Sequence, residues 1–243
     1  MKSLLSAISF LLATSGVALA RPSEQEPPNG MIGVVRLPML FGNGPCERFQ
    51  PRPVRLYSKQ TEHALVGHAR VTKPWVVAED GGCNGLEVSV SILDSSSSEG
   101  LPTLEYGYET PAAIVLAKTR GWCQIKLQSR TAWIRNECEP GFIPASDLLR
   151  DKLLYLLPGA LELAVSTPGG TKFGTSSILR DAMVVHVDLL NTKTVMGVVW
   201  LQVSASHISV CEGEPPPNEK QTFWLPLSNK AGRLYVWFYS RGC

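Results

Sequence analysis

Six cysteines and four histidines are the residues of this chain whose chemistry depends most on spacing. No two cysteines stand at the C-x-x-C spacing of a zinc site, and no histidine lies near enough in sequence to complete one. An even number of cysteines in an exported chain is typical of disulfide bonds, so we expect pairs and no metal site. The six are Cys46, Cys83, Cys123, Cys138, Cys211 and Cys243.

The sequence leaves the cysteine pairing open, because six cysteines allow many connectivities. Order along the chain favours Cys46–Cys83, Cys123–Cys138 and Cys211–Cys243, since each of these pairs lies within one structural segment. A bridge between Cys123 and Cys138 would close a short loop and stabilise the fold by about 3 kcal/mol at most.

Nucleophilic catalysis finds little support in the residues. There is no G-x-S-x-G motif, and the serines at 95–98 lie in a low-complexity loop. A cysteine nucleophile would need a free thiol, which an even cysteine count in an oxidising compartment does not provide. We therefore expect no enzyme and no cofactor, although paired carboxylates remain an open alternative. The histidines that could partner a cysteine nucleophile are His63, His68, His186 and His207.

Aromatic side chains near the C-terminus are the best candidates for ligand binding. Alternation over residues 234–239 places Tyr235, Trp237 and Tyr239 on one face of a strand. Such a face could stack on a sugar or a peptide, because Tyr and Trp combine apolar area with a polar tip. The alternative is that both faces are buried, between the domain interior and a neighbouring domain. Tyr106 and Tyr108 pose the same question.

The elements that would position these residues are short strands bounded by Gly, Pro, Asn and Ser. One helical connector is expected over residues 144–157, with Ser146 as a cap and leucines at helical spacing. No long amphipathic helix is present, so a wound α/β sheet is not expected. The predicted strands cover residues 54–57, 86–92, 113–117, 122–127, 131–135, 183–190, 198–203, 222–227 and 234–239.

The N-terminus has the pattern of a signal peptide over residues 1–20. Lys2 precedes an uncharged apolar run, and Ala18-Leu19-Ala20 has the small-x-small pattern of a cleavage site. An uncleaved anchor is the alternative, but the apolar run is short for a membrane span. We expect a periplasmic or secreted protein with a flexible lead-in over residues 21–31 and no membrane insertion after cleavage.

The charge pattern argues against nucleic acid as a partner. Loss of Lys2 with the leader lowers the formal net charge from +2 to +1, since the leader carries no acidic residue. Lysines and arginines are scattered, whereas nucleic acids and anionic membranes require a concentrated basic surface.

Two tryptophan-containing pairs of segments match each other across the halves of the chain. Trp122-Cys123-Gln124-Ile125 resembles Trp200-Leu201-Gln202-Val203, and Thr131-Ala132-Trp133-Ile134 resembles Thr222-Phe223-Trp224-Leu225. A small barrel has little core, so we expect these large rings to fill much of it.

At these residues the chain resembles the bacterial Src-homology-3-type domain. Gly121-Trp122 and Ala132-Trp133-Ile134 match two elements of that family's core, and residues 54–67 look like its opening segment, with an insertion over residues 72–109. The resemblance implies an all-β protein of two tandem small Src-homology-3-like barrels, disulfide-stapled and joined by the short helical connector. The expected domains cover residues 32–149 and 150–243.

The resemblance also implies a class of function. Such domains commonly serve as targeting modules, so we expect a non-catalytic binding module of the bacterial cell envelope. Its partner would be a peptidoglycan fragment or an envelope protein. The alternatives are a structural or scaffolding protein of the periplasm without a small ligand, and an unrecognised hydrolase.

Overall fold

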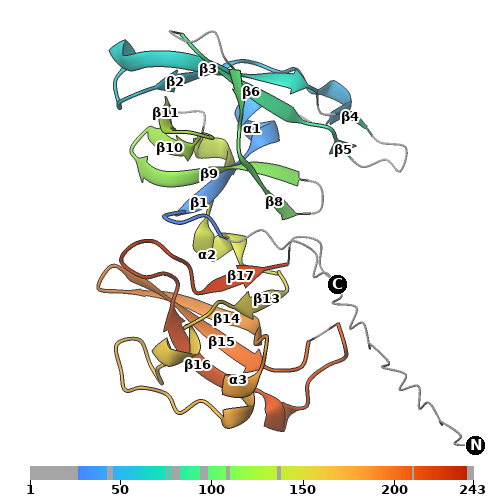
Figure 1. The fold of residues 1–243 in the computed structure, drawn as a ribbon, viewed down its shortest axis with the longest axis vertical. Coiled ribbons are helices and arrows are strands. Elements are labelled where there is room, and N and C mark those ends of the chain that lie inside the picture. The colour runs from blue at the N-terminus through green and yellow to red at the C-terminus, as the bar shows by residue number, and fades with distance from the viewer. Residues whose placement is uncertain are drawn as a thin grey trace, which may run out of the picture.

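The computed structural model describes residues 27–42, 46–74, 76–77, 83–93, 98–107, 110–135, 138–209 and 211–239. They form a mostly β structure with two large antiparallel sheets, and Figure 1 shows these sheets stacked along the long axis. The predicted signal peptide lies outside the described residues, as do Tyr108 and Cys243.

The first sheet has the strand order β12-β1-β9-β10-β11-β2-β3-β6-β7, with β8 paired to β9. A separate two-stranded ribbon joins β4 to β5. The strands are β1 (Gly33–Arg36), β2 (Val54–Tyr57), β3 (Leu65–Lys73), β4 (Val76–Val77), β5 (Cys83–Asn84), β6 (Glu87–Ile92), β7 (Ser98–Gly100), β8 (Thr103–Gly107), β9 (Thr110–Thr119), β10 (Trp122–Lys126), β11 (Thr131–Arg135) and β12 (Phe142–Pro144).

The second sheet has the order β16-β15-β14-β13-β17. Its strands are β13 (Leu154–Leu156), β14 (His186–Val195), β15 (Val198–Ser206), β16 (Gln221–Pro226) and β17 (Val236–Phe238). The helices of the described residues are short: α1 (Leu37–Phe41), α2 (Ala145–Leu148), α3 (Ser177–Asp181), and the 3₁₀ turns η1 (Cys46–Arg48), η2 (Glu62–Ala64), η3 (Glu139–Gly141), η4 (Leu161–Leu163) and η5 (Pro217–Glu219).

Both sheets contain the same five-strand arrangement, in which the fifth strand lies beside the first and the second to fourth form a meander. Strands β1, β9, β10, β11 and β12 make the first repeat, and β13 to β17 make the second repeat. The segment between β1 and β9 supplies the remaining strands of the first sheet, so the insertion is larger than residues 72–109. The strand beside β9 is β1, whereas the predicted opening strand, Val54–Tyr57, lies at the outer edge of β11.

The expectation of closed barrels is wrong, because both sheets are open. In the first sheet, Tyr57 of β2 pairs with Trp133 of β11, and the other edge of β2 pairs with β3. The outer edge of β11 is therefore paired with β2, so β11 cannot pair with β12 to close the sheet into a barrel. In the second sheet, the chain that follows β16 meets the chain that precedes β17 through one bridge, between Ser228 and Leu234.

The helical connector is also shorter than expected. Helix α2 ends at Leu148, and Asp151 has a positive φ of 55°, which is incompatible with continuing a helix. Leu154 and Tyr155 are then buried in β13, paired with β14 and β17. Tertiary burial in the sheet thus outweighs the helical spacing of the leucines in this segment.

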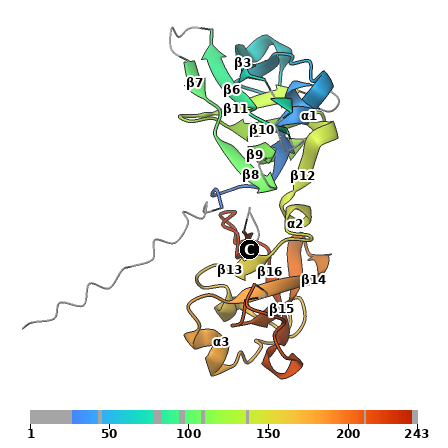
Figure 2. The same cartoon turned by 90° about the vertical axis from the view of Figure 1, so that its right-hand side faces the viewer.

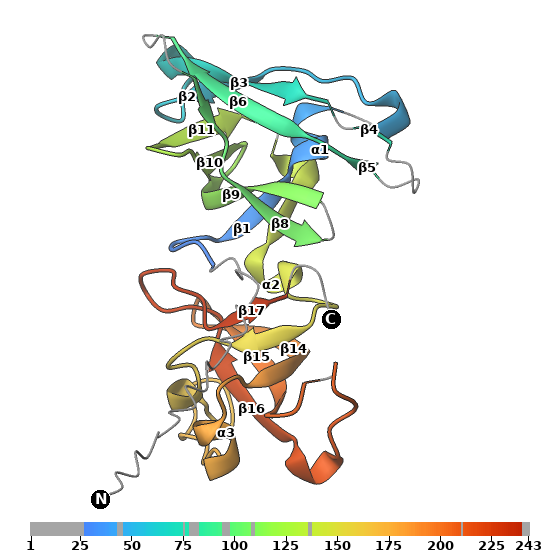
Figure 3. The ribbon, with the colours of Figure 1, turned by 45° about the vertical axis from the view of Figure 1, so that its right-hand side comes forward.

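The second repeat packs against the first sheet, as the views in Figure 2 and Figure 3 also show. Consecutive residues of β1 face different cores: Val34 belongs to a cluster shared with the second repeat, and Val35 to a cluster within the first half. Strand β9 does the same with Ile114 and Val115. The continuous apolar sequence of β9 is therefore explained by burial on both faces.

The sequence repeat occupies equivalent places in the two sheets. Gln124 of β10 lies opposite Trp133 of β11, and Gln202 of β15 lies opposite Trp224 of β16. However, the tryptophans do not fill the cores as expected: they alternate with the buried residues of these strands and lie half-buried on the outer side. We call Trp122, Gln124 and Trp133 the first Trp face, and Trp200, Gln202 and Trp224 the second Trp face.

Two predicted disulfides are confirmed, Cys46–Cys83 and Cys123–Cys138. Cys211 is disulfide-bonded as well, and its predicted partner Cys243 lies outside the described residues. Disulfides of this kind indicate a non-reducing, exported location. No helix of the described residues is long and apolar enough to cross a membrane.

Candidate functional site

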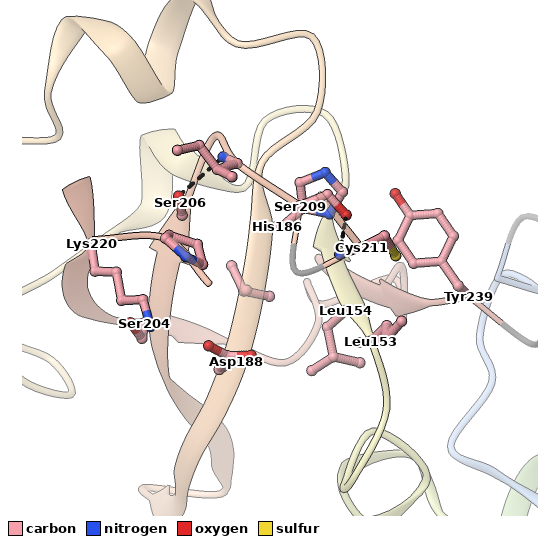
Figure 4. Close-up of a pocket in the computed structure, with 13 residues that line it drawn as sticks. Leu153, Leu154, His186, Asp188, Ser204, Ser206, Ser209, Cys211, Lys220 and Tyr239 are labelled. Atoms are coloured by element: carbon pink, nitrogen blue, oxygen red, sulfur yellow. Dashed lines mark hydrogen bonds between the residues drawn. The ribbon is translucent and has the colours of Figure 1, made fainter. Parts of the chain in front are cut away.

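A small cavity lies where β14 and β15 meet the loop that contains Cys211. Figure 4 shows its lining, with His186 and Tyr239 on one side and Asp188, Ser204 and Lys220 on the other. The complete lining is Leu153, Leu154, His186, Val187, Asp188, Ser204, Ser206, Ile208, Ser209, Cys211, Pro215, Lys220 and Tyr239.

Ring stacking and side-chain hydrogen bonds hold the walls of this cavity. The Tyr239 ring lies 4.7 Å from the Tyr155 ring and 6.0 Å from the His186 ring, measured between centroids. The Cys211 N–H donates to the Ser209 hydroxyl at 3.2 Å. The ring contacts hold Tyr239 against the sheet, and the hydrogen bond lies within the loop.

The size of the cavity decides its role. Its volume is about 20 Å³, which is close to the space that one water molecule requires. A cavity of this size does not admit a substrate, whatever the chemistry of its lining. We interpret it as a structural cavity rather than as a binding site.

A much larger groove lies on the second repeat, between the end of β13 and the chain that leads into β14. Its volume is about 760 Å³, within the range of small-molecule and peptide sites. We call it the loop groove. Its lining is Leu156, Leu157, Pro158, Gly159, Leu161, Glu162, Lys172, Phe173, Gly174, Thr175, Leu179, Arg180, Ala182, Met183 and Val185.

Local sequence signals shape the two walls of the loop groove. Pro158 and Gly159 end β13, and Gly159 takes a φ of +85° that favours glycine. On the other wall, Ser176 is the N-cap of α3, and its hydroxyl accepts from the Leu179 N–H at 3.3 Å. The cap fixes the short helix that carries Arg180 to the rim of the groove.

The floor of the loop groove is anchored to the core. The Phe173 N–H donates to the Ala164 carbonyl at 2.8 Å, and the Phe173 ring lies 5.6 Å from the buried Phe223 ring. Leu179 is the buried residue of α3. The groove thus presents an apolar floor that is already formed.

Charged side chains stand at the rim of the loop groove. Lys172 and Arg180 contribute two positive charges and Glu162 one negative charge, and all three residues are exposed. No described residue forms an ion pair with Lys172 or Arg180. The rim is therefore positive by one charge and suits a ligand that carries a carboxylate.

The aromatic residues predicted from β17 do not form one exposed face. Trp237 is only 2% exposed, and its ring lies 4.6 Å from the Phe238 ring. Tyr235 is half-buried against the core shared by the two halves, and Tyr239 lines the small cavity. Both faces of β17 are thus covered, between the second repeat and the first sheet.

Tyr106 lies apart from these residues along the chain, in β8. It is half-buried and packs against the shared core. Its predicted companion Tyr108 lies outside the described residues.

The histidines do not gather into a site. His63 is exposed in η2, and His68 lies in β3. His207 forms an ion pair with Glu219 at 3.8 Å, a contact that requires protonation of the imidazole. Among the described residues, no group of three or more His, Cys, Asp or Glu side chains is placed to hold a metal ion.

Sequence reasoning missed the residues of the loop groove. Most of them come from turns and loops, and the helices among them are too short to show periodicity, so no pattern marked Phe173, Arg180 or Met183 as neighbours. The outward position of the tryptophans could have been predicted, because Trp122 and Gln124 alternate with Cys123 and Ile125.

Comparison with known proteins adds no relative to these observations. No protein-family model, curated protein or solved structure matches this chain.

Proposed function

We propose that this protein is a non-catalytic, exported binding module of the bacterial cell envelope, built from two Src-homology-3-type units. Its loop groove would recognise a cell-wall fragment or a segment of an envelope protein. The strand order common to the two repeats, and the equivalent positions of their tryptophans, support the relationship of the two units.

The observation that carries the proposal is the loop groove itself. A volume of about 760 Å³ with an apolar floor accommodates an extended segment several residues long. The positive rim favours a ligand with carboxylates, such as the stem peptides of peptidoglycan. A binding role also agrees with a groove whose floor is anchored to the core through Phe173.

Co-sedimentation of the mature, oxidised protein with purified peptidoglycan tests this function. Arg180→Glu reverses a charge at the rim, and Met183→Asp places a charge on a groove residue that is 86% exposed. Each variant should weaken co-sedimentation about tenfold, since a repelled or desolvated charge costs more than 1 kcal/mol. Neither side chain is buried, so the fold should be kept.

Arg233→Glu is the matched control, because Arg233 is exposed on the second repeat but does not line the groove. Equal loss in Arg180→Glu and Arg233→Glu would show that binding depends on overall charge and not on the groove. If the wild-type protein does not co-sediment at all, the cell wall is not the ligand, and cross-linking in cells should identify the envelope protein instead.

A further inference from the structure

Each repeat brings two tryptophans and one glutamine to the same face of a strand pair. Residues directly opposite in an antiparallel pair share a face, so Gln202 shares a face with Trp224, and Trp200 with Pro226. In the first repeat, Gln124 and Trp133 stand in the same relation. The tryptophans of one face sit at diagonal positions, about 7–8 Å apart at their Cα atoms.

These faces point away from the cores. In β15, the neighbours Leu201 and Val203 are fully buried, whereas Trp200 and Gln202 are half-buried. In β16, Phe223 and Leu225 are buried on either side of Trp224. The indole rings of the second Trp face therefore lie at the outer surface of the sheet.

Side chains of the insertion and of β11 contact the first Trp face. The Tyr57 ring stands edge-on to the Trp122 ring at 5.2 Å, and the Arg135 guanidinium lies 5.9 Å from the Trp122 ring centroid. Tyr57 comes from the insertion and pairs with Trp133, and Arg135 is held by an ion pair with Glu62. The surface of Trp122 is thus occupied from within the chain.

The second repeat lacks both covering groups. Val165 takes the place of Tyr57, since it bridges to Trp224 as Tyr57 pairs with Trp133. Pro226 takes the place of Arg135, since it lies opposite Trp200 as Arg135 lies opposite Trp122. Among the described residues, no aromatic ring or cation contacts Trp200 or Trp224.

Polar and apolar groups border the second Trp face. Lys193 of β14 lies directly opposite Trp200 and is exposed, and Val198 is 41% exposed beside it. The second Trp face therefore offers two indoles, one amide and one ammonium group on a single surface.

We propose that the second Trp face is a binding surface for a glycan chain, in which sugar rings lie on Trp200 and Trp224. This inference rests on the proposed function and names a second part of the same cell-wall ligand. The C–H faces of a sugar pack on an indole, while its hydroxyl groups exchange hydrogen bonds with the amide of Gln202 and with Lys193. A carboxylate on the sugar chain would pair with Lys193.

The pairing of β16 favours a glycan over an added peptide strand. An extended peptide gains most of its affinity by hydrogen bonding to a free sheet edge. The edge beside Trp224 is already taken, because Val165 and Trp224 exchange backbone hydrogen bonds at 2.8 and 2.9 Å. A ligand on this surface must therefore lie on the faces of the rings, as sugars do.

Glycan strands freed of their stem peptides by an amidase are the probe that tests this surface, with binding followed by calorimetry. Trp200→Ala and Trp224→Ala should each weaken binding about tenfold, the loss typical of a truncated aromatic contact. Gln202→Ala and Lys193→Ala should weaken binding as well, and these smaller changes guard against misfolding. Trp122→Ala is the matched control, since its ring is covered, and it should leave glycan affinity unchanged.

The outcomes separate this inference from the proposed function. Binding of intact peptidoglycan that Arg180→Glu weakens, with no binding of bare glycan strands, overturns the inference and leaves the function standing. Glycan binding that survives Trp200→Ala and Lys193→Ala also overturns it. Dimers that dissociate on Trp200→Ala would show that a second copy covers this face instead. Failure to bind intact peptidoglycan in any form refutes the cell-wall function and the inference together.

Discussion

The Tyr57 ring stands edge-on to the Trp122 ring, with 5.2 Å between the ring centroids and 86° between the ring planes. Tyr57 belongs to the insertion, and Trp122 begins the third strand of the first repeat. The contact therefore joins the inserted strands to the five-strand repeat that they extend. Edge-to-face geometry of this kind is favourable because the positive edge of one ring meets the negative face of the other.

Replacing Tyr57 tests how much this contact stabilises the first sheet. Tyr57→Ala should lower the free energy of unfolding by about 3 kcal/mol, since Tyr57 is buried and its loss leaves a cavity. Tyr57→Phe keeps the ring and should cost less than about 1 kcal/mol. Urea unfolding followed by tryptophan fluorescence measures both values. Equal losses in the two variants would mean that the hydroxyl, and not the ring, makes the important contact.

The packing of the two halves can be tested at two consecutive residues of β1. Val34 faces the core shared with the second repeat, Val35 faces the core of the first half, and both side chains are 0% exposed. Val34→Ala and Val35→Ala should therefore each destabilise the protein by about 2 kcal/mol. Calorimetric unfolding of both variants gives the comparison. If Val34→Ala changed stability by less than about 0.5 kcal/mol, the face of β1 toward the second repeat would be open to solvent in solution.

The strands that sequence patterns predict best are those whose alternation reflects one buried face. Strands β2 and β11 have the predicted bounds, Val54–Tyr57 and Thr131–Arg135, because each alternates between core and outer side. The pairing of β1 with β9 was not predictable in this way. A long insertion separates these strands in the sequence, and periodicity within a strand carries no information on its partner.

Two of the wrong predictions, the long helical connector and the tryptophan-filled cores, share a physical cause, since in each a local preference was given more weight than the tertiary environment. The leucines at 148, 149, 153 and 154 have helical spacing, but the sheet buries Leu154 between β14 and β17. The tryptophans are large and apolar, but strand alternation places Leu201 and Phe223 inward and Trp200 and Trp224 outward. The loop groove showed no pattern, because it is formed mostly by turns and loops, together with helices too short to show periodicity.

The Cys123–Cys138 bridge should stabilise the fold by lowering the conformational entropy of the unfolded chain. It closes a loop with a sequence separation of 15 residues, so Cys123→Ala/Cys138→Ala should lower the free energy of unfolding by about 3 kcal/mol. Urea unfolding without reductant provides the measurement, and the difference between variant and wild-type protein should vanish when both are fully reduced. A thiol titration of unfolded, unreduced wild-type protein should find only trace thiol. A stoichiometric thiol would contradict the disulfide assignments.

The hairpin between β14 and β15 turns at Met196 and Gly197, whose φ angles are 50° and 77°. Positive φ at both positions is typical of a type I′ turn, which prefers Asn at the first position because Met is strained there. Met196 is also 99% exposed, so its side chain gains nothing from burial. Met196→Asn should therefore raise the free energy of unfolding by about 0.5–1 kcal/mol.

Thermal unfolding of Met196→Asn beside Met183→Asn gives a matched comparison of two exposed methionines. Met183 is 86% exposed and does not occupy a positive φ, so its replacement should leave the melting temperature nearly unchanged. An increase confined to Met196→Asn would assign the gain to relief of backbone strain. A decrease in Met196→Asn would mean that the methionine side chain is held in a contact in solution, and the hairpin tip would then belong to an interface.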